Sequence, residues 1–155
     1  MSYVYERQAP VDLPSMRPVV ELLNRAKSKG LQFPKLWLQF GAKKPLRITI
    51  AGDQSRTPGY LMLTDGGPYG GNQYYGRISP AGKFELGRDL RDDRAAVVGL
   101  LIQLGDDPEK IAAAFGHMTG NCCFCSRKLS DARSIETGYG KSCAARFGMR
   151  WGTAR

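Results

Sequence analysis

Three of the four cysteines in the chain lie in a pattern that is typical of a metal site. Cys122 and Cys125 form a Cys-x-x-Cys turn, and Cys143 follows the glycine-rich segment Gly-Tyr-Gly-Lys-Ser. A Cys-x-x-Cys turn presents two thiolates to one cation, and a third thiolate supplies most of a tetrahedral site. Zinc fits this set of ligands best, because it prefers four sulfur or nitrogen ligands and needs no redox chemistry. The pattern therefore predicts a zinc ion in the C-terminal part of the chain.

The residue types leave the fourth ligand of this ion open. His117, the only histidine, lies five residues before Cys122 and is the preferred candidate. Cys123 is the alternative, although its side chain should point away from a metal that is held by the cysteines around it. A thiol from a second chain, or a water molecule, would also complete the site.

A disulfide or buried free thiols are the competing interpretations of the cysteines. Disulfides are typical of secreted proteins, and the first residues, Met-Ser-Tyr-Val-Tyr-Glu-Arg, lack the apolar stretch of a signal peptide. No apolar run approaches the length that crosses a membrane. We therefore expect a cytoplasmic protein with reduced thiols and a bound zinc.

The charge of the chain favours an anionic partner. The 155 residues carry a formal net charge of +9, and residues 121–155 hold seven Lys and Arg against two Asp and Glu. An excess of this size is most often used to bind nucleic acid, although a merely soluble basic protein is the simpler explanation.

The hydrophobic pattern predicts an α+β fold in three parts. Residues 1–13 are expected to form an extended arm, residues 14–116 an α+β domain, and residues 117–155 a zinc-binding tail. Alternating or apolar segments predict an antiparallel β-meander, and apolar stripes of helical period predict the helices that flank it. The predicted strands cover residues 35–40, 46–50, 60–64, 74–79 and 83–86, and the predicted helices cover residues 17–29, 93–104, 108–115 and 144–148.

The last forty or so residues resemble a small zinc-binding domain of unknown function that is common in bacteriophage and some bacterial proteins. Its motif is T-G-x-C-x-x-C-x-R-x-L-x-D-x-x-S followed by G-x-G-x-x-C-A. The matching residues are Thr119, Gly120, Cys122, Cys125, Arg127, Leu129, Asp131, Ser134, Gly138, Gly140, Cys143 and Ala144. The resemblance implies a phage or prophage origin and a C-terminal mini-domain that is held together by zinc, of treble-clef-like or knuckle type. It implies no activity. A treble clef would often place its fourth ligand three residues after Cys143, where this chain has Arg146, which cannot bind a metal.

Eight residues form the candidate nucleic-acid surface. Outward positions of the sheet supply one part, in which Tyr75 would stack a base, and the basic tail supplies the other. The candidates are Arg47, Tyr75, Arg77, Lys83, Arg127, Lys128, Lys141 and Arg146. Ordinary sheet packing of Tyr75 and plain solvation of the charges are the competing interpretations. No helix carries a dense Arg and Lys stripe suited to the major groove, so binding would depend on the backbone and have low sequence specificity.

We expect a small, non-catalytic zinc-binding protein of phage type that binds nucleic acid as an accessory or regulatory factor. The alternative is a protein-interaction module or inhibitor that docks on a host or phage enzyme, and a structural subunit is a further reading. An enzyme is not expected, because the metalloprotease and deaminase motifs are missing and the glycine-rich segment 66–71 does not match a phosphate loop.

Overall fold

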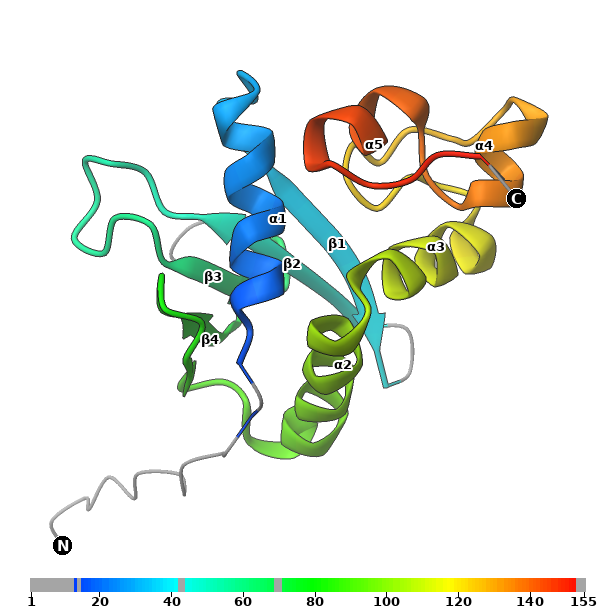
Figure 1. Ribbon diagram of the computed structural model, residues 1–155. Helices are drawn as coiled ribbons and strands as arrows, with labels where there is room; N and C mark the ends of the chain where they lie inside the picture. Colours follow the sequence, from blue (N-terminus) through cyan, green and yellow to red (C-terminus); the bar gives the residue numbers. More distant parts are fainter. Residues whose placement is uncertain (1–12, 14, 42–43, 69–70, 153–155) are drawn as a thin grey trace, which may run out of the picture.

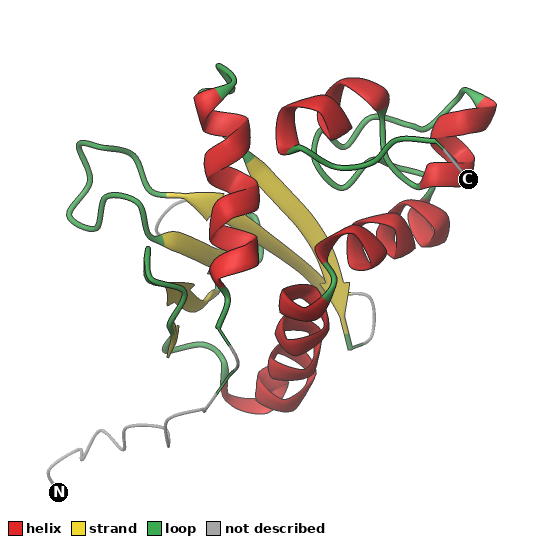
Figure 2. Ribbon diagram, viewed as in Figure 1, coloured by secondary structure: helices red, strands yellow, loops and turns green. Residues whose placement is uncertain are grey.

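A five-stranded antiparallel sheet with helices against one face forms the main body of the protein (Figure 1). The computed structural model describes residues 13, 15–41, 44–68 and 71–152. The arm predicted for residues 1–13 lies outside the described residues, apart from Leu13. The α+β prediction is confirmed: a β-meander, flanking helices and a C-terminal cysteine cluster are all present (Figure 2).

Each strand pairs with the next one along the chain, so the sheet order is β1-β2-β3-β4-β5. The strands are β1 (Lys35–Phe40), β2 (Lys44–Ile50), β3 (Leu61–Thr64), β4 (Tyr74–Ile78) and β5 (Phe84–Leu86). Leu36 and Leu38 of β1, with Leu46 and Ile48 of β2, are fully buried, and the residues between them are partly exposed. This period of two follows from the pleat, which directs successive side chains to opposite faces.

A β-bulge in β4 reverses the predicted orientation of Tyr75. Leu63 of β3 pairs with Gly76, but Thr64 pairs with Tyr74, so Tyr75 is an extra residue without a partner. Gly76, with φ of 152°, allows this geometry. Tyr75 is therefore 3 % exposed, and its ring packs edge-on against Phe40 at 5.3 Å between ring centroids. The prediction that Tyr75 faces outward to stack a base is wrong.

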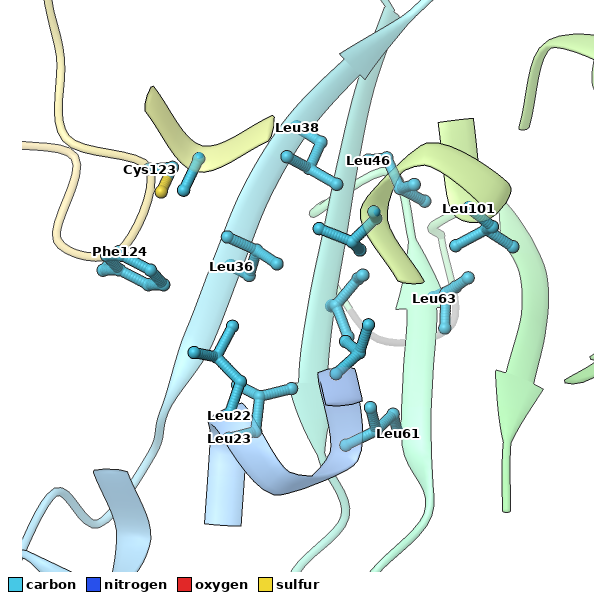
Figure 3. Packing of buried hydrophobic residues seen from close by; sticks show 14 of the residues in the cluster. Leu22, Leu23, Leu36, Leu38, Leu46, Leu61, Leu63, Leu101, Cys123 and Phe124 are labelled. Atoms are coloured by element: carbon cyan, nitrogen blue, oxygen red, sulfur yellow. The ribbon is translucent and has the colours of Figure 1, made fainter. Parts of the chain in front are cut away.

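Helices α1 (Arg17–Ser28) and α2 (Arg94–Asp106) pack on one face of the sheet (Figure 1). Leu22 and Leu23 of α1 meet Leu36 of β1 in the core (Figure 3). The short 3-10 helix η1 (Arg91–Asp93) precedes α2, and α3 (Pro108–Thr119) follows it. Asp107 caps α3 as predicted, because its carboxylate accepts a hydrogen bond from the Lys110 amide.

The C-terminal part contains two short helices, α4 (Ala132–Thr137) and α5 (Lys141–Phe147), and it packs on α1. The rings of Phe124 and Phe147 stack at 4.0 Å, and Arg25 of α1 donates a hydrogen bond to the Phe147 carbonyl. One continuous buried cluster includes both the sheet core and this part of the chain. Helix α3 crosses the predicted boundary at residues 116 and 117, and the division into domains stays a prediction.

Within the described residues, no helix has both the length and the apolar character that crossing a membrane requires.

Candidate metal centre and basic pocket

The first two cysteines of the candidate site lie in a tight knuckle that the backbone closes. The Cys122 amide donates to the Arg127 carbonyl at 2.9 Å, and the Ser126 amide donates back to the Cys122 carbonyl at the same distance. Asn121 and Lys128 form an antiparallel bridge at its base. Ser126 adopts a left-handed conformation, with φ of 65°, which turns the chain sharply after Cys125.

The third cysteine is brought to the knuckle by α4 and α5. Asp131 caps α4, because its carboxylate accepts from the Ser134 amide at 3.0 Å, and Gly138 ends this helix with φ of 95°. The chain then enters α5, whose first turn carries Cys143. The sulfur atoms of Cys122, Cys125 and Cys143 all lie within 4.8 Å of one another.

Two of the three thiols, Cys122 and Cys143, share one proton, and this sharing favours metal binding. A hydrogen bond from the Cys143 thiol lowers the pKa of Cys122 from 9.0 to about 5, although burial opposes the shift, and backbone amides support the anion. The pKa of Cys143 is correspondingly raised, because its proton is shared with the Cys122 sulfur. The shared proton thus favours the thiolate form of Cys122, which is the form that binds a metal ion.

The geometry of the cluster fits a tetrahedral thiophilic ion. With metal–sulfur bonds of about 2.3 Å, ligand sulfurs in a tetrahedral site lie about 3.8 Å apart. The observed separations, within 4.8 Å, need only a small contraction to reach this spacing. The three cysteines predicted from the sequence are thus brought together in a group that can hold a metal ion.

The structure does not bring His117 to this group. His117 is exposed on α3, and its Nε2 lies 2.7 Å from the Glu136 carbonyl oxygen. It lines a different hollow, of about 460 Å³, with Tyr139 and Trp151. Helix α3 continues to Thr119 rather than ending before the histidine, and this continuation holds the imidazole over α4.

Cys123 is also separate from the other thiols. Its side chain is 0 % exposed and lies in the core beside Leu36 of β1 (Figure 3). Its carbonyl accepts a hydrogen bond from the Trp37 amide at 2.7 Å, which attaches the knuckle to the sheet. Burial raises the pKa of the Cys123 thiol well above its usual value, so this thiol stays protonated.

The four basic tail residues that the sequence singled out surround a single pocket of about 370 Å³. All four are exposed, and they are Arg127, Lys128, Lys141 and Arg146. Cys122, Cys125 and Cys143 form part of the wall of the same pocket. Among the described residues, none of the four cations forms an ion pair with a carboxylate, although Lys141 lies over the Trp151 ring at 5.4 Å.

The basic residues predicted on the sheet lie elsewhere and are partly neutralised. Arg77 pairs with Glu85 at 3.2 Å and covers the Tyr60 ring. Arg47 lies over Trp37, with 5.7 Å from its guanidinium carbon to the ring centroid. Lys83 is exposed and immediately precedes β5. None of these three residues lines the pocket of the cysteines.

Four polar residues that were not among the predicted site residues also line the pocket, and Ser130 is one of them. Asp131 and Ser134 line it from the start of α4, and Ser142 lines it from α5. The Asp-x-x-Ser spacing of Asp131 and Ser134 was a usable signal, because an aspartate three residues before a free backbone amide is typical of a helix N-terminus.

The comparison with known proteins finds a match for the C-terminal part of the chain alone. Residues 112–148 match the model of DUF6011, a family of unknown function. The matched segment starts within α3 and ends just after α5, so it includes the knuckle, α4 and all three clustered cysteines. No curated protein and no solved structure gives a significant match to the chain.

Proposed function

We propose that this chain is a non-catalytic zinc protein that binds nucleic acid through the pocket beside its three clustered cysteines. The family match covers the part of the chain that carries the pocket, but a family of unknown function supplies no activity. The proposal therefore depends on the charges and the sulfur ligands. From the motif we infer an accessory or regulatory role in phage or prophage biology.

One observation carries this proposal: Arg127, Lys128, Lys141 and Arg146 converge on one pocket without carboxylate partners in the described part of the chain. Bringing four cations together is unfavourable unless an anion neutralises them. A zinc ion with three thiolates carries a net charge of −1, and together with the Asp131 carboxylate in the same wall it offsets two of the four. The remaining positive charge suits the repeated phosphates of a nucleic acid backbone.

Zinc would stabilise the fold of this region rather than take part in chemistry. The cysteines come from the knuckle and from α5, which are separated in the chain by α4. A metal ion that joins them holds the basic residues of both segments around the same pocket. Metal binding and phosphate binding should therefore be lost together.

The test is fluorescence anisotropy with a labelled oligonucleotide, single-stranded and then duplex, at several salt concentrations. Four phosphate contacts predict that log K falls with log salt at a slope of about −3 for single strands and about −4 for duplex. Replacing each pocket cation by Gln should reduce the magnitude of this slope by about 0.7 to 0.9. Arg56→Gln is the matched control, because Arg56 is exposed and lies outside the pocket.

Two results would contradict the proposal. If Arg47→Gln and Arg77→Gln weaken binding while the four pocket variants do not, the nucleic acid lies on the sheet. If no DNA or RNA binds at low salt, the pocket serves another partner, and a protein that recognises the basic tail becomes the better candidate.

A further inference from the structure

The described part of the chain supplies three of the four ligands that a zinc ion prefers. The single histidine and all four cysteines are among the described residues, and only Cys122, Cys125 and Cys143 come together. No Asp or Glu oxygen in the described ranges joins them. His117 is held at the Glu136 carbonyl, and Cys123 lies in the core. A bound ion would thus keep one position for a ligand that no Cys, His, Asp or Glu side chain in the described ranges supplies.

The pocket shows which chemistry this fourth ligand would have. All three sulfur ligands are in its wall, so a molecule inside the pocket can reach the ion. Four cations and one carboxylate, Asp131, also line it, and a zinc ion with three thiolates adds a charge of −1. The carboxylate is occupied as the cap of α4. The balance is positive, so an anion is favoured over a neutral thiol or water.

We propose that a phosphate oxygen from outside the chain is the fourth ligand of the zinc ion. Zinc accepts oxygen ligands at about 2.0–2.2 Å, and Arg and Lys side chains donate charge-assisted hydrogen bonds to the other phosphate oxygens. Arg146 lies three residues after Cys143 on α5 and lines the pocket together with the three sulfur ligands. It is therefore the cation that we expect to donate to a phosphate held at the metal.

This inference rests on the proposed function for the source of the phosphate, which is the nucleic acid backbone. The metal–phosphate contact itself can be tested without nucleic acid. The four cations would then have two roles, since they hold the phosphate and place one of its oxygens on the metal.

The experiment uses the full chain loaded with cobalt(II) in place of zinc, in buffer free of phosphate. The visible d–d bands of thiolate-bound cobalt report the fourth ligand directly. Inorganic phosphate should change these bands saturably, whereas perchlorate at the same ionic strength should not. Arg146→Gln should raise the phosphate concentration at half-saturation about tenfold, as expected for one lost hydrogen bond to a charged group. Arg56→Gln should leave it unchanged, and cobalt content after desalting shows that phosphate has not extracted the metal.

Three results would overturn the inference. The first is a spectrum that stays constant as inorganic phosphate is raised. The second is a spectrum that already changes in His117→Ala or Cys123→Ser without phosphate, which assigns the fourth ligand to the chain. A spectrum that depends on protein concentration would assign it to a second chain. If phosphate leaves the cobalt d–d bands unchanged while the anisotropy assay shows nucleic acid binding, the cations alone bind the nucleic acid backbone. In that case only this inference fails. If cobalt responds and no nucleic acid binds, the metal–phosphate contact stands and the proposed function fails.

Discussion

Cys122 and Cys123 are neighbours in the chain, yet their side chains belong to different parts of the protein. The Cys122 sulfur lies with those of Cys125 and Cys143, and the Cys123 side chain is fully buried in the core against β1. The Cys123 carbonyl also accepts from the Trp37 amide. The knuckle therefore presents a thiol that can bind a metal on one side and a packing residue on the other, which connects the candidate metal centre to the sheet.

This arrangement predicts that mutations of Cys122 and of Cys123 have different effects on zinc content and on stability. Cys122→Ala should reduce the zinc content of the purified protein from about one ion per chain to nearly none. Cys123→Ser should keep the zinc but lower the free energy of unfolding by roughly 1–3 kcal/mol, because it buries a hydroxyl in an apolar core. Metal analysis and denaturant unfolding measure the two effects.

Cys123→Ala is the matched control for the serine variant, since it removes the sulfur without adding a polar group. It should keep the zinc as well. Loss of zinc in both Cys123 variants, with Cys122→Ala still loaded, would show that Cys123 is the metal ligand and that the knuckle faces the other way.

Acid titration of the metal-free protein should show one thiolate that persists at pH values far below the usual pKa of a cysteine thiol. The Cys143 hydrogen bond lowers the pKa of Cys122 to about 5. Because the folded pKa of Cys122 lies below its unfolded value and that of Cys143 lies above it, the pair stabilises the fold most near pH 9. The Cys122 contribution is lost as pH falls through about 5, and the proton held by Cys143 lowers stability as pH rises above 9. Ultraviolet thiolate absorbance follows the titration.

Two variants assign the transition. Cys122→Ala should abolish it, and Cys143→Ala should move it upward, because the donor that stabilises the Cys122 anion is gone. An unchanged midpoint in Cys143→Ala would mean that the two sulfurs do not share a proton.

The strands were predictable because a buried sheet face needs only a period of two. Leu36, Leu38, Leu46 and Ile48 alternate in the sequence and in the structure. The cysteine group was predictable for a similar reason, since the spacing in the knuckle fixes how near Cys122 and Cys125 must be. The strands and the Cys122–Cys125 pair depend on neighbours in the chain, whereas Cys143 reaches the knuckle only through α4 and α5.

Tyr75 and His117 could not be placed in this way. The orientation of Tyr75 depends on the bulge between β3 and β4. It therefore depends on how the residues of β4 pair with those of β3. The position of His117 depends on the packing of α3 against α4, a helix that sequence reasoning missed. Contacts between distant segments decide both positions, and local pattern carries little information about such contacts.

Tyr75→Ala tests the corrected position of the tyrosine. Removing a ring that is 3 % exposed and packs on Phe40 should lower the free energy of unfolding by roughly 3–5 kcal/mol. Tyr74→Ala is the control, because Tyr74 lies beside it in β4 and is only half-buried, so its loss should cost less. Thermal or denaturant unfolding measures both. A stable Tyr75→Ala protein with weakened binding to single strands would restore the outward, base-stacking role.

Gly116 of α3 meets Gly138, the residue that ends α4, and this contact leaves no room for a side chain. A Cβ built on Gly116 would overlap the Gly138 carbonyl. Gly116→Ala should therefore push α4 away from α3 and lower the free energy of unfolding by roughly 1–3 kcal/mol or more. Because Gly138 shortly precedes Cys143, zinc affinity should fall as well.

Gly99→Ala is the matched control, since Gly99 is inside α2 and a Cβ there meets nothing within 4 Å. This second change should raise the free energy of unfolding by roughly 0.5–1 kcal/mol, because alanine loses less backbone entropy than glycine in a helix. Denaturant unfolding of the two variants and a competition assay with a zinc chelator give the comparison. If Gly116→Ala is as stable as Gly99→Ala and keeps its zinc, then α3 and α4 do not need this close contact to bring Cys143 to the knuckle.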